Sequence, residues 1–299
     1  MKNISESWCI QIDITNYCTH KCLYCSRYNR HLRPNQRKHM NIETFLLALK
    51  SLKNWPTKIG IIGGEPLLHP EFKLINYLLR KHFPKDKLGL WTSGIPNTDL
   101  TDPRTDPDIM RTYGFVAYNP HTIEQKKKCR HQPLTIAINE VVPENIMWKL
   151  IDQCWVQRTW CATITHKGAY FCEVAAAQDI LLNEGKNAWK IEDNWWEIGP
   201  DSSKFQEQVK KLCPNCGMAL PVERETLEVI KEKITPLLLK KFTDCNLLHT
   251  SKNDIEIFHH VFTKGEINKN IMNWYPGNYR EDLTSDELAG EGRGFMGFI

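Results

Sequence analysis

Apolar and polar positions along the first half of the chain predict strands that alternate with helices. Short apolar runs rich in β-branched residues indicate buried strands, and apolar residues repeated every three or four positions indicate helices packed by one face. Strands are predicted at 8–15, 58–62, 87–92, 114–118 and 134–142. Helices are predicted at 41–52, 70–82 and 144–154.

The order of these elements predicts the topology. Strands joined through helices pair in parallel, and about five such units by residue 154 indicate an incomplete (β/α) barrel. The pattern then changes to a hairpin at 159–171 and an alanine-rich helix at about 173–183. We therefore predict an α/β fold in three parts: a partial barrel over 1–154, a small α+β domain over 155–221 and a C-terminal extension over 222–299 with no assigned role.

Length, composition and charge limit the class of protein. Its 299 residues and 41% hydrophobic content suffice for one large domain with a smaller appendage. The 39 basic and 35 acidic residues are scattered and give a formal net charge of +4, so nucleic-acid binding is not indicated. No leader peptide and no run of about 18 apolar residues is present. We expect a cytoplasmic protein that does not associate with membranes.

The eleven cysteines point to metal chemistry. An odd count fits poorly with a fully paired disulfide framework, which leaves metal or cluster ligation as the leading explanation. Four cysteines stand alone in the sequence and are expected to be small buried apolar residues. They are Cys9, Cys129, Cys154 and Cys245. The other seven form two groups.

The first group, Cys18, Cys22 and Cys25, directly follows the first predicted strand. Three thiolates then share one loop at the carboxyl end of a strand, where barrel active sites are built. Three ligands on a four-iron cluster leave one iron open to chelate a small molecule. Zinc is the alternative, with His20 or His31 as a fourth ligand.

The second predicted strand ends in the sequence Gly63-Gly64-Glu65-Pro66. Glycine lets the backbone approach a ligand closely, and a carboxylate accepts hydrogen bonds from an ammonium group. Taken alone, the segment could also be an ordinary turn between a strand and a helix.

Together these segments resemble the radical S-adenosylmethionine (radical SAM) superfamily. Its signature is Cys-x3-Cys-x-aromatic-Cys followed by a Gly-Gly-Glu-Pro loop, and Tyr24 holds the aromatic position. The resemblance implies a partial (β/α)6, TIM-like barrel in which a 4Fe-4S cluster on the three cysteines binds S-adenosylmethionine. It implies that Tyr24 lies near the adenine. It also implies that the methionine end is held by Gly63, Gly64, Glu65 and Pro66. Thr92 and Ser93, at the end of the third strand, are candidates for a further cofactor contact or for a simple turn.

The second group consists of cysteines on the predicted hairpin and on a later knuckle. They are Cys161, Cys172, Cys213 and Cys216. The Cys213-Pro-Asn-Cys216-Gly segment is a common zinc knuckle, so zinc is one reading. The set also resembles the SPASM/twitch region of radical SAM enzymes, in its shorter twitch form, which holds one auxiliary 4Fe-4S cluster. A cluster with four cysteine ligands has no open iron and passes electrons instead of binding substrate.

The resemblance implies a reaction as well. S-adenosylmethionine is cleaved reductively to a 5′-deoxyadenosyl radical, which abstracts a hydrogen atom from a small polar substrate such as a sugar, aminocyclitol or nucleoside. We expect an oxidation with the auxiliary cluster as electron acceptor, and an external one-electron reductant of the flavodoxin or ferredoxin type. The alternatives are a radical mutase, a peptide-modifying maturase and a non-catalytic binding protein stabilised by zinc or a cluster. The sequence names no catalytic residue, although Glu173 and Asp179 are candidates for handling protons.

Overall fold

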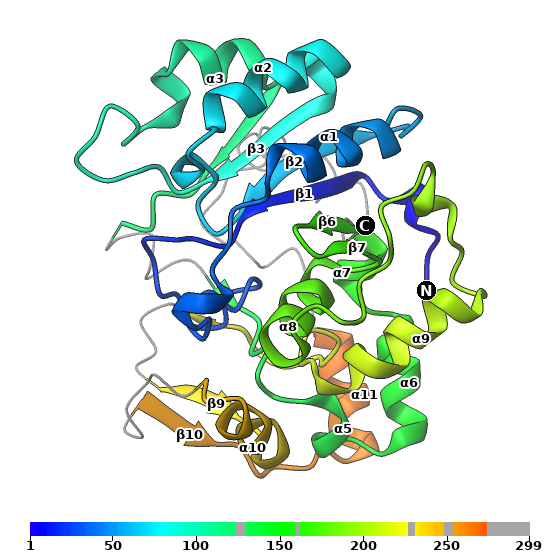
Figure 1. The fold of residues 1–299 in the computed structure, drawn as a ribbon. Helices are drawn as coiled ribbons and strands as arrows, with labels where there is room; N and C mark the ends of the chain where they lie inside the picture. The colour runs from blue at the N-terminus through cyan, green and yellow to red at the C-terminus, as the bar shows by residue number, and fades with distance from the viewer. Residues whose placement is uncertain (123–129, 160–161, 227–230, 248–253, 274–299) are drawn as a thin grey trace.

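The computed structural model describes residues 1–122, 130–159, 162–226, 231–247 and 254–273. Within these residues six strands form the main sheet, in the order β4-β3-β2-β1-β6-β7 (Figure 1). The strands are β1 (Cys9–Thr15), β2 (Lys58–Gly63), β3 (Leu88–Thr92), β4 (Phe115–Tyr118), β6 (Thr163–Thr165) and β7 (Gly168–Tyr170).

β1 lies at the centre of this sheet. It pairs in parallel with β2 on one side and with β6 on the other, and β2, β3 and β4 continue the parallel arrangement. Ile10, Ile12 and Ile14 on one face of β1 and Cys9 and Gln11 on the other are all buried, as expected of a strand covered on both faces. Only β7 runs antiparallel, because it returns from β6 through a tight hairpin.

Three helices return the chain between the first four strands and lie on one side of the sheet (Figure 1). They are α1 (Ile42–Ser51), α2 (Phe72–His82) and α3 (Pro107–Thr112). α1 begins where the side chain of Asn41 accepts a hydrogen bond from the Thr44 amide at 2.8 Å, which satisfies a donor of the first turn. α3 begins in the same way at Asp106.

The second half of the chain packs below β1 and around the β6–β7 hairpin (Figure 1). Its helices are α5 (Ile138–Val141), α6 (Glu144–Asp152), α7 (Trp155–Thr159), α8 (Glu173–Asn183), α9 (Ser203–Leu212), α10 (Pro236–Asp244) and α11 (Lys264–Asn273). Two small sheets complete the fold. They pair β5 (Arg130–His131) with β8 (Glu225–Thr226), and β9 (Glu232–Ile234) with β10 (Ile255–Ile257).

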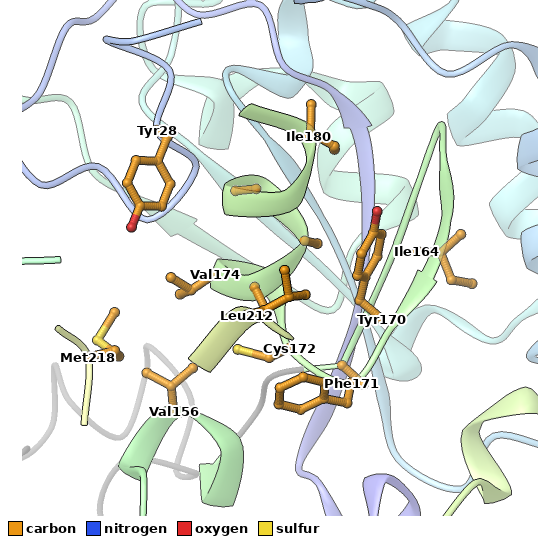
Figure 2. Packing of buried hydrophobic residues seen from close by; sticks show 14 of the residues in the cluster. Tyr28, Val156, Ile164, Tyr170, Phe171, Cys172, Val174, Ile180, Leu212 and Met218 are labelled. Atoms are coloured by element: carbon orange, nitrogen blue, oxygen red, sulfur yellow. The ribbon is translucent and has the colours of Figure 1, made fainter. Parts of the chain in front are cut away.

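Buried side chains from both halves of the chain form one continuous core. Figure 2 shows Phe171, Cys172 and Leu212 packed beside α8. Tyr170 is fully buried, and its hydroxyl donates to Oδ2 of Asp179 at 2.9 Å. The hydrogen bond satisfies the one polar atom of this aromatic side chain inside the core.

The predicted fold class is confirmed, because the main sheet is mostly parallel and open, as in a partial TIM-like barrel. The strand predicted at 134–142 is wrong: this segment forms a turn and then the short helix α5. Its apolar residues, Leu134 and Ile138 among them, are buried, and a short buried apolar run is the same in a strand and in a helix. Within the described residues, four parallel strands precede residue 154 instead of five, and β6 of the hairpin supplies the fifth.

The described part of the chain contains no helix both long and apolar enough to cross a membrane. β6 hydrogen-bonds to β1, so residues 155–221 share the main sheet with residues 1–154. The three-part division of the chain therefore remains a prediction.

Candidate functional site

The carboxyl ends of the parallel strands bring the predicted site segments to one edge of the sheet. β1 leads into the loop with the first three cysteines, β2 into Gly63-Gly64-Glu65, and β3 into Ser93. Parallel strands end on the same side, and open α/β folds bind their ligands there.

The first cysteine loop holds its sulfurs in a buried setting. Burial raises the pKa of the Cys18 thiol to about 12, and the neighbouring Cys25 adds to the rise, which indicates that the two sulfurs are close. The His20 amide donates to Cys18 Sγ at 3.4 Å. Cys22 Sγ lies 3.9 Å from Nδ1 of His121. This places His121, which follows β4, beside the loop that follows β1.

Cys25 is half-buried, and desolvation raises the pKa of its thiol. The backbone amides of Asn29 and Arg27 and the Arg27 guanidinium oppose that rise. Amide donors directed at sulfur stabilise a thiolate, which is the form that binds iron. Three cysteines on one loop with such donors fit the donor set of a four-iron cluster with one open iron.

Glu65 is fully buried, and its carboxylate joins the ends of β2 and β3. Oε1 accepts hydrogen bonds from Thr92 Oγ1 at 2.6 Å and from the Leu67 amide at 3.1 Å. Oε2 accepts from the amide and the hydroxyl of Ser93, at 2.7 and 2.6 Å. Burial raises the pKa of Glu65, and these four hydrogen bonds oppose the rise. Thr92 and Ser93 therefore orient Glu65, and their contact with the cofactor remains a prediction.

Gly63 and Gly64 are required by the cysteine loop itself. Gly63 has a φ of +151°, and a Cβ at this position would lie 2.1 Å from the Thr15 carbonyl oxygen. A Cβ at Gly64 would lie 2.1 Å from the carbonyl oxygen of Tyr17, the residue before Cys18. The amides of Gly64 and Glu65 donate to these same two carbonyls at 2.7 Å. The two glycines thus let β2 approach the start of the cysteine loop closely. The sequence alone suggests that they allow a close approach to a ligand.

Tyr24 has a left-handed backbone, with a φ of +51°, and its side chain is buried. Its hydroxyl accepts a hydrogen bond from the Lys233 amide at 2.8 Å, which ties the cysteine loop to β9. Pro66 is buried and begins the short 3₁₀ turn Pro66–Leu68. The contacts of both residues with S-adenosylmethionine remain predictions.

A buried polar cluster lies between the two cysteine groups and was not expected. Arg27 Nη2 donates to Glu173 Oε2 at 2.7 Å and to Gln11 Oε1 at 2.5 Å, and Arg27 Nε lies 3.3 Å from Asp13 Oδ1. Burial raises the pKa of Asp13 to about 6 in spite of the nearby guanidinium. Arg27 Nη1 has no hydrogen-bond partner, and Asp13 Oδ1 has the ion pair with Arg27 Nε as its polar contact. Asp179, the other acidic candidate, is fully buried and bonded to Tyr170, so it has a structural role.

The structure brings three predicted members of the second cysteine group together. Cys172, Cys213 and Cys216 line one small cavity. Cys154, expected to be an isolated apolar residue, lines the same cavity. No local sequence feature marks Cys154, since it reaches the others only through the tertiary fold. Cys161 lies outside the described residues.

The described residues show neither a ready site for a single metal ion nor a disulfide bond. No group of three or more His, Cys, Asp or Glu side chains among them is arranged to hold one metal ion. The nine cysteines within the described ranges form no disulfide bond with one another.

The chain is similar to one protein family and to solved structures. Residues 12–139 match the sequence profile of the radical SAM superfamily. No curated protein matches the chain. A crystal structure of BtrN in complex with AdoMet and 2-DOIA aligns with 70% of this chain and 88% of BtrN, at 14% identity and a TM-score of 0.43. Selenomethionine BtrN in an open conformation aligns with 73% of this chain and 95% of BtrN, at 14% identity and a TM-score of 0.42.

At this level of similarity neither BtrN alignment bears on the site or the substrate of this chain. The profile match, in contrast, spans β1 to β4 with the first cysteine loop and the Gly63–Pro66 segment. The match implies S-adenosylmethionine and a 4Fe-4S cluster as cofactors. The chain therefore contains a radical SAM domain, over residues 12–139, and is an enzyme.

Proposed function

We propose that the protein is a radical SAM dehydrogenase that oxidises a small polar molecule such as a sugar, an aminocyclitol or a nucleoside. The observation that carries the proposal is a direct link between the two cysteine groups. Arg27 follows Cys25 by two residues and bonds Glu173, the residue after Cys172, at 2.7 Å. A substrate radical formed beside the first group would need this proximity to pass an electron to a cluster at the second group.

Cys18, Cys22 and Cys25 would hold the first cluster. When bound, it supplies the electron that cleaves S-adenosylmethionine to methionine and a 5′-deoxyadenosyl radical, which takes a hydrogen atom from the substrate. The Gly63–Pro66 segment would hold the methionine amine, and Tyr24 would lie near the adenine. Glu65 keeps this segment fixed against Thr92 and Ser93, so the cofactor site is formed before the cofactor binds.

The buried polar cluster supports a polar substrate. An unpaired polar atom inside a protein is costly, and Arg27 Nη1 is such an atom beside the Asp13 carboxylate. A hydroxyl or amino group of a substrate could accept from Arg27 and donate to Asp13. Both residues lie next to the first cysteine loop, as a substrate that meets the radical must.

A two-electron oxidation by this route removes a hydrogen atom, a proton and an electron from the substrate. The hydrogen atom leaves in 5′-deoxyadenosine, and the substrate radical must then lose one proton and one electron. Asp13 Oδ1 can take the proton, because a carboxyl whose pKa is about 6 is ionised near neutral pH and still basic enough to accept it. The electron would pass to a second 4Fe-4S cluster on the second cysteine group, with zinc at that group as the alternative. An external one-electron reductant, of the flavodoxin or ferredoxin type, would start each turnover.

Two measurements test this function on the anaerobically reconstituted enzyme. Dithionite should drive cleavage of S-adenosylmethionine to 5′-deoxyadenosine, and a variant with Cys18, Cys22 and Cys25 all replaced by Ala should not cleave it. With deuterated sugars, aminocyclitols and nucleosides as candidates, the true substrate should transfer deuterium to 5′-deoxyadenosine. One S-adenosylmethionine should be consumed for each product.

The same assay separates oxidation from rearrangement. A mutase returns the hydrogen atom to its product and regenerates the cofactor. Many products per S-adenosylmethionine, with deuterium in the product, would therefore contradict the dehydrogenase. Cys213→Ala should stop product formation while uncoupled cofactor cleavage continues.

A further inference from the structure

A cavity of about 30 Å³ lies between the ends of α6, α8 and α9. Four of the nine cysteines within the described ranges line it: Cys154, Cys172, Cys213 and Cys216. Figure 2 shows Cys172 between Phe171 and Leu212, two of the apolar residues that complete the wall. Gln157 contributes the one hydrogen-bonding side chain among the other lining residues.

The local backbone positions each of the four sulfurs. Cys154 occupies the turn between α6 and α7, and Cys172 directly precedes α8. Cys213 and Cys216 bracket the 3₁₀ turn that follows α9, where the Cys216 amide donates to the Cys213 carbonyl at 3.1 Å. The cavity therefore collects thiols from three separate stretches of the chain.

Amide donors reach the sulfur of Cys154 as they do other cysteines of the site. The backbone amides of Gln157 and Val156 hydrogen-bond to the Cys154 sulfur. The Met218 amide donates to Cys216 Sγ at 3.4 Å. An apolar residue needs no such donors, whereas a thiolate ligand is stabilised by them.

The four sulfurs are close enough to influence each other. Cys172 and Cys213 lie within electrostatic range of Cys154, and Cys216 lies within range of Cys213. Among the described residues that line the cavity, none is Lys, Arg or His, and the ammonium group of the lining residue Met1 is paired with Asp152. A bound metal centre would supply positive charge, and the thiols would lose their protons as it binds.

The number of thiols around the cavity also fits a four-iron cluster. The described residues offer no site for one ion, and the ligands of a four-iron cube stand further apart than those of a single zinc. Such a cube takes four thiolates, and the four cysteines around this cavity complete the set.

We propose that Cys154 is the fourth ligand of the auxiliary 4Fe-4S cluster, in place of Cys161. The proposal rests on the proposed function in one respect, that this cavity holds a four-iron cluster. It changes the ligand set expected from the sequence, in which Cys161 filled that position.

The test uses the full chain with Cys18, Cys22 and Cys25 replaced by Ala, so that only the second cluster is counted. This parent should hold about four irons and four sulfides per chain after anaerobic reconstitution. Adding Cys161→Ala should leave that content and the EPR spectrum of the reduced protein unchanged. Adding Cys154→Ala should remove half or more of the iron, or leave a three-iron species visible by EPR before reduction.

Two further variants separate ligation from folding. Cys245→Ala removes a half-buried free cysteine outside the cavity and should match the parent. Cys154→Ser keeps the size of the side chain and offers an oxygen ligand, so it should retain iron with a shifted EPR signal. A purely structural role for Cys154 predicts an unshifted signal.

The outcomes distinguish the assignment of Cys154 as a ligand from the existence of the auxiliary cluster. Full iron in the Cys154→Ala variant with an unshifted Cys154→Ser signal would overturn the assignment of Cys154. Loss of iron in the Cys161→Ala variant equal to or greater than that in Cys154→Ala would do the same. Either result leaves the auxiliary cluster standing. A parent without iron would overturn the cluster itself, and the ligand assignment with it.

Discussion

The Glu65 carboxylate illustrates how much of this site depends on single side chains. Its two oxygens accept four hydrogen bonds, from Thr92, Leu67 and twice from Ser93. These bonds fasten β3 to the end of β2 and leave the negative charge of the carboxylate to attract an ammonium group. Any ammonium group that binds here meets a carboxylate already held in place. Changing its chemistry should therefore affect both the fold and the ligand.

We expect Glu65→Gln to weaken S-adenosylmethionine binding about ten- to a hundredfold, since a charge-assisted hydrogen bond is lost. An amide NH₂ would also face donors, and this should lower the free energy of unfolding by about 1–3 kcal/mol. Calorimetric titration and denaturant unfolding measure the two effects, with iron content unchanged. Thr92→Val, which removes one of the four donors, should show a smaller loss of stability. Binding equal to that of the wild type would reduce the segment to a structural turn.

The raised pKa of Asp13 predicts that the free energy of unfolding depends on pH. Its pKa in the folded protein, about 6, lies above the ordinary value of 3.8, so between these values the folded state binds more protons than the unfolded state. Stability should fall as pH rises through this window, by an amount on the order of 3 kcal/mol, and then level off.

Denaturant unfolding between pH 4 and 7 measures the effect, and Asp13→Asn should abolish it. Acid loss of bound clusters is common to both proteins and cancels in the comparison. Parallel stability curves for the two proteins would mean that Asp13 is ionised throughout and is not the group that accepts a proton near pH 6.

At the scale of elements, the contact between the end of β2 and the cysteine loop sets the geometry of the first site. Gly64 lies where any side chain would strike the Tyr17 carbonyl, and the same carbonyl accepts from the Glu65 amide. The loop before Cys18 is thus positioned by backbone contacts that leave no room for a methyl group.

Gly64→Ala should therefore push residues 15–17 away from β2 and lower the iron held by the first cluster. A local overpacking of this kind costs typically 1–3 kcal/mol. Iron analysis in a Cys213→Ala, Cys216→Ala background isolates the first cluster. Gly199→Ala is the matched control, because its added Cβ would meet its nearest atom at 3.4 Å. Equal iron in both glycine variants would contradict the steric account.

Elements marked by local pattern could be predicted from the sequence. β1 to β3 and α1 follow the predicted ranges to within one residue at most ends, since apolar spacing and caps such as Asn41 are local signals. The segment around Leu134 and Ile138 gave the wrong element because burial on all sides removes any periodicity. Cys154 and the Arg27–Glu173 pair could not be predicted, because 18 residues separate Cys154 from Cys172 and 146 separate Arg27 from Glu173. The cofactor roles of the cysteines stay predictions.

At the scale of the whole molecule, one pair of strands supports both cysteine groups. β1 leads to Cys18, and β6 leads through its hairpin to Cys172, with Gln11 opposite Thr163 in the ladder between them. The pair Arg27–Glu173 spans the same two regions and is buried on both sides. Bringing these groups together therefore needs no closure of one domain upon another.

The pairing of β1 with β6 has a consequence for electron tunnelling. Tunnelling rates fall steeply with the gap between donor and acceptor, and here the gap would be set by a ladder of main-chain hydrogen bonds. A slip of one residue in that ladder would move one group past the other by about 3.3 Å and turn its side chains to the opposite face. The backbone register would thus fix the length of the proposed electron path.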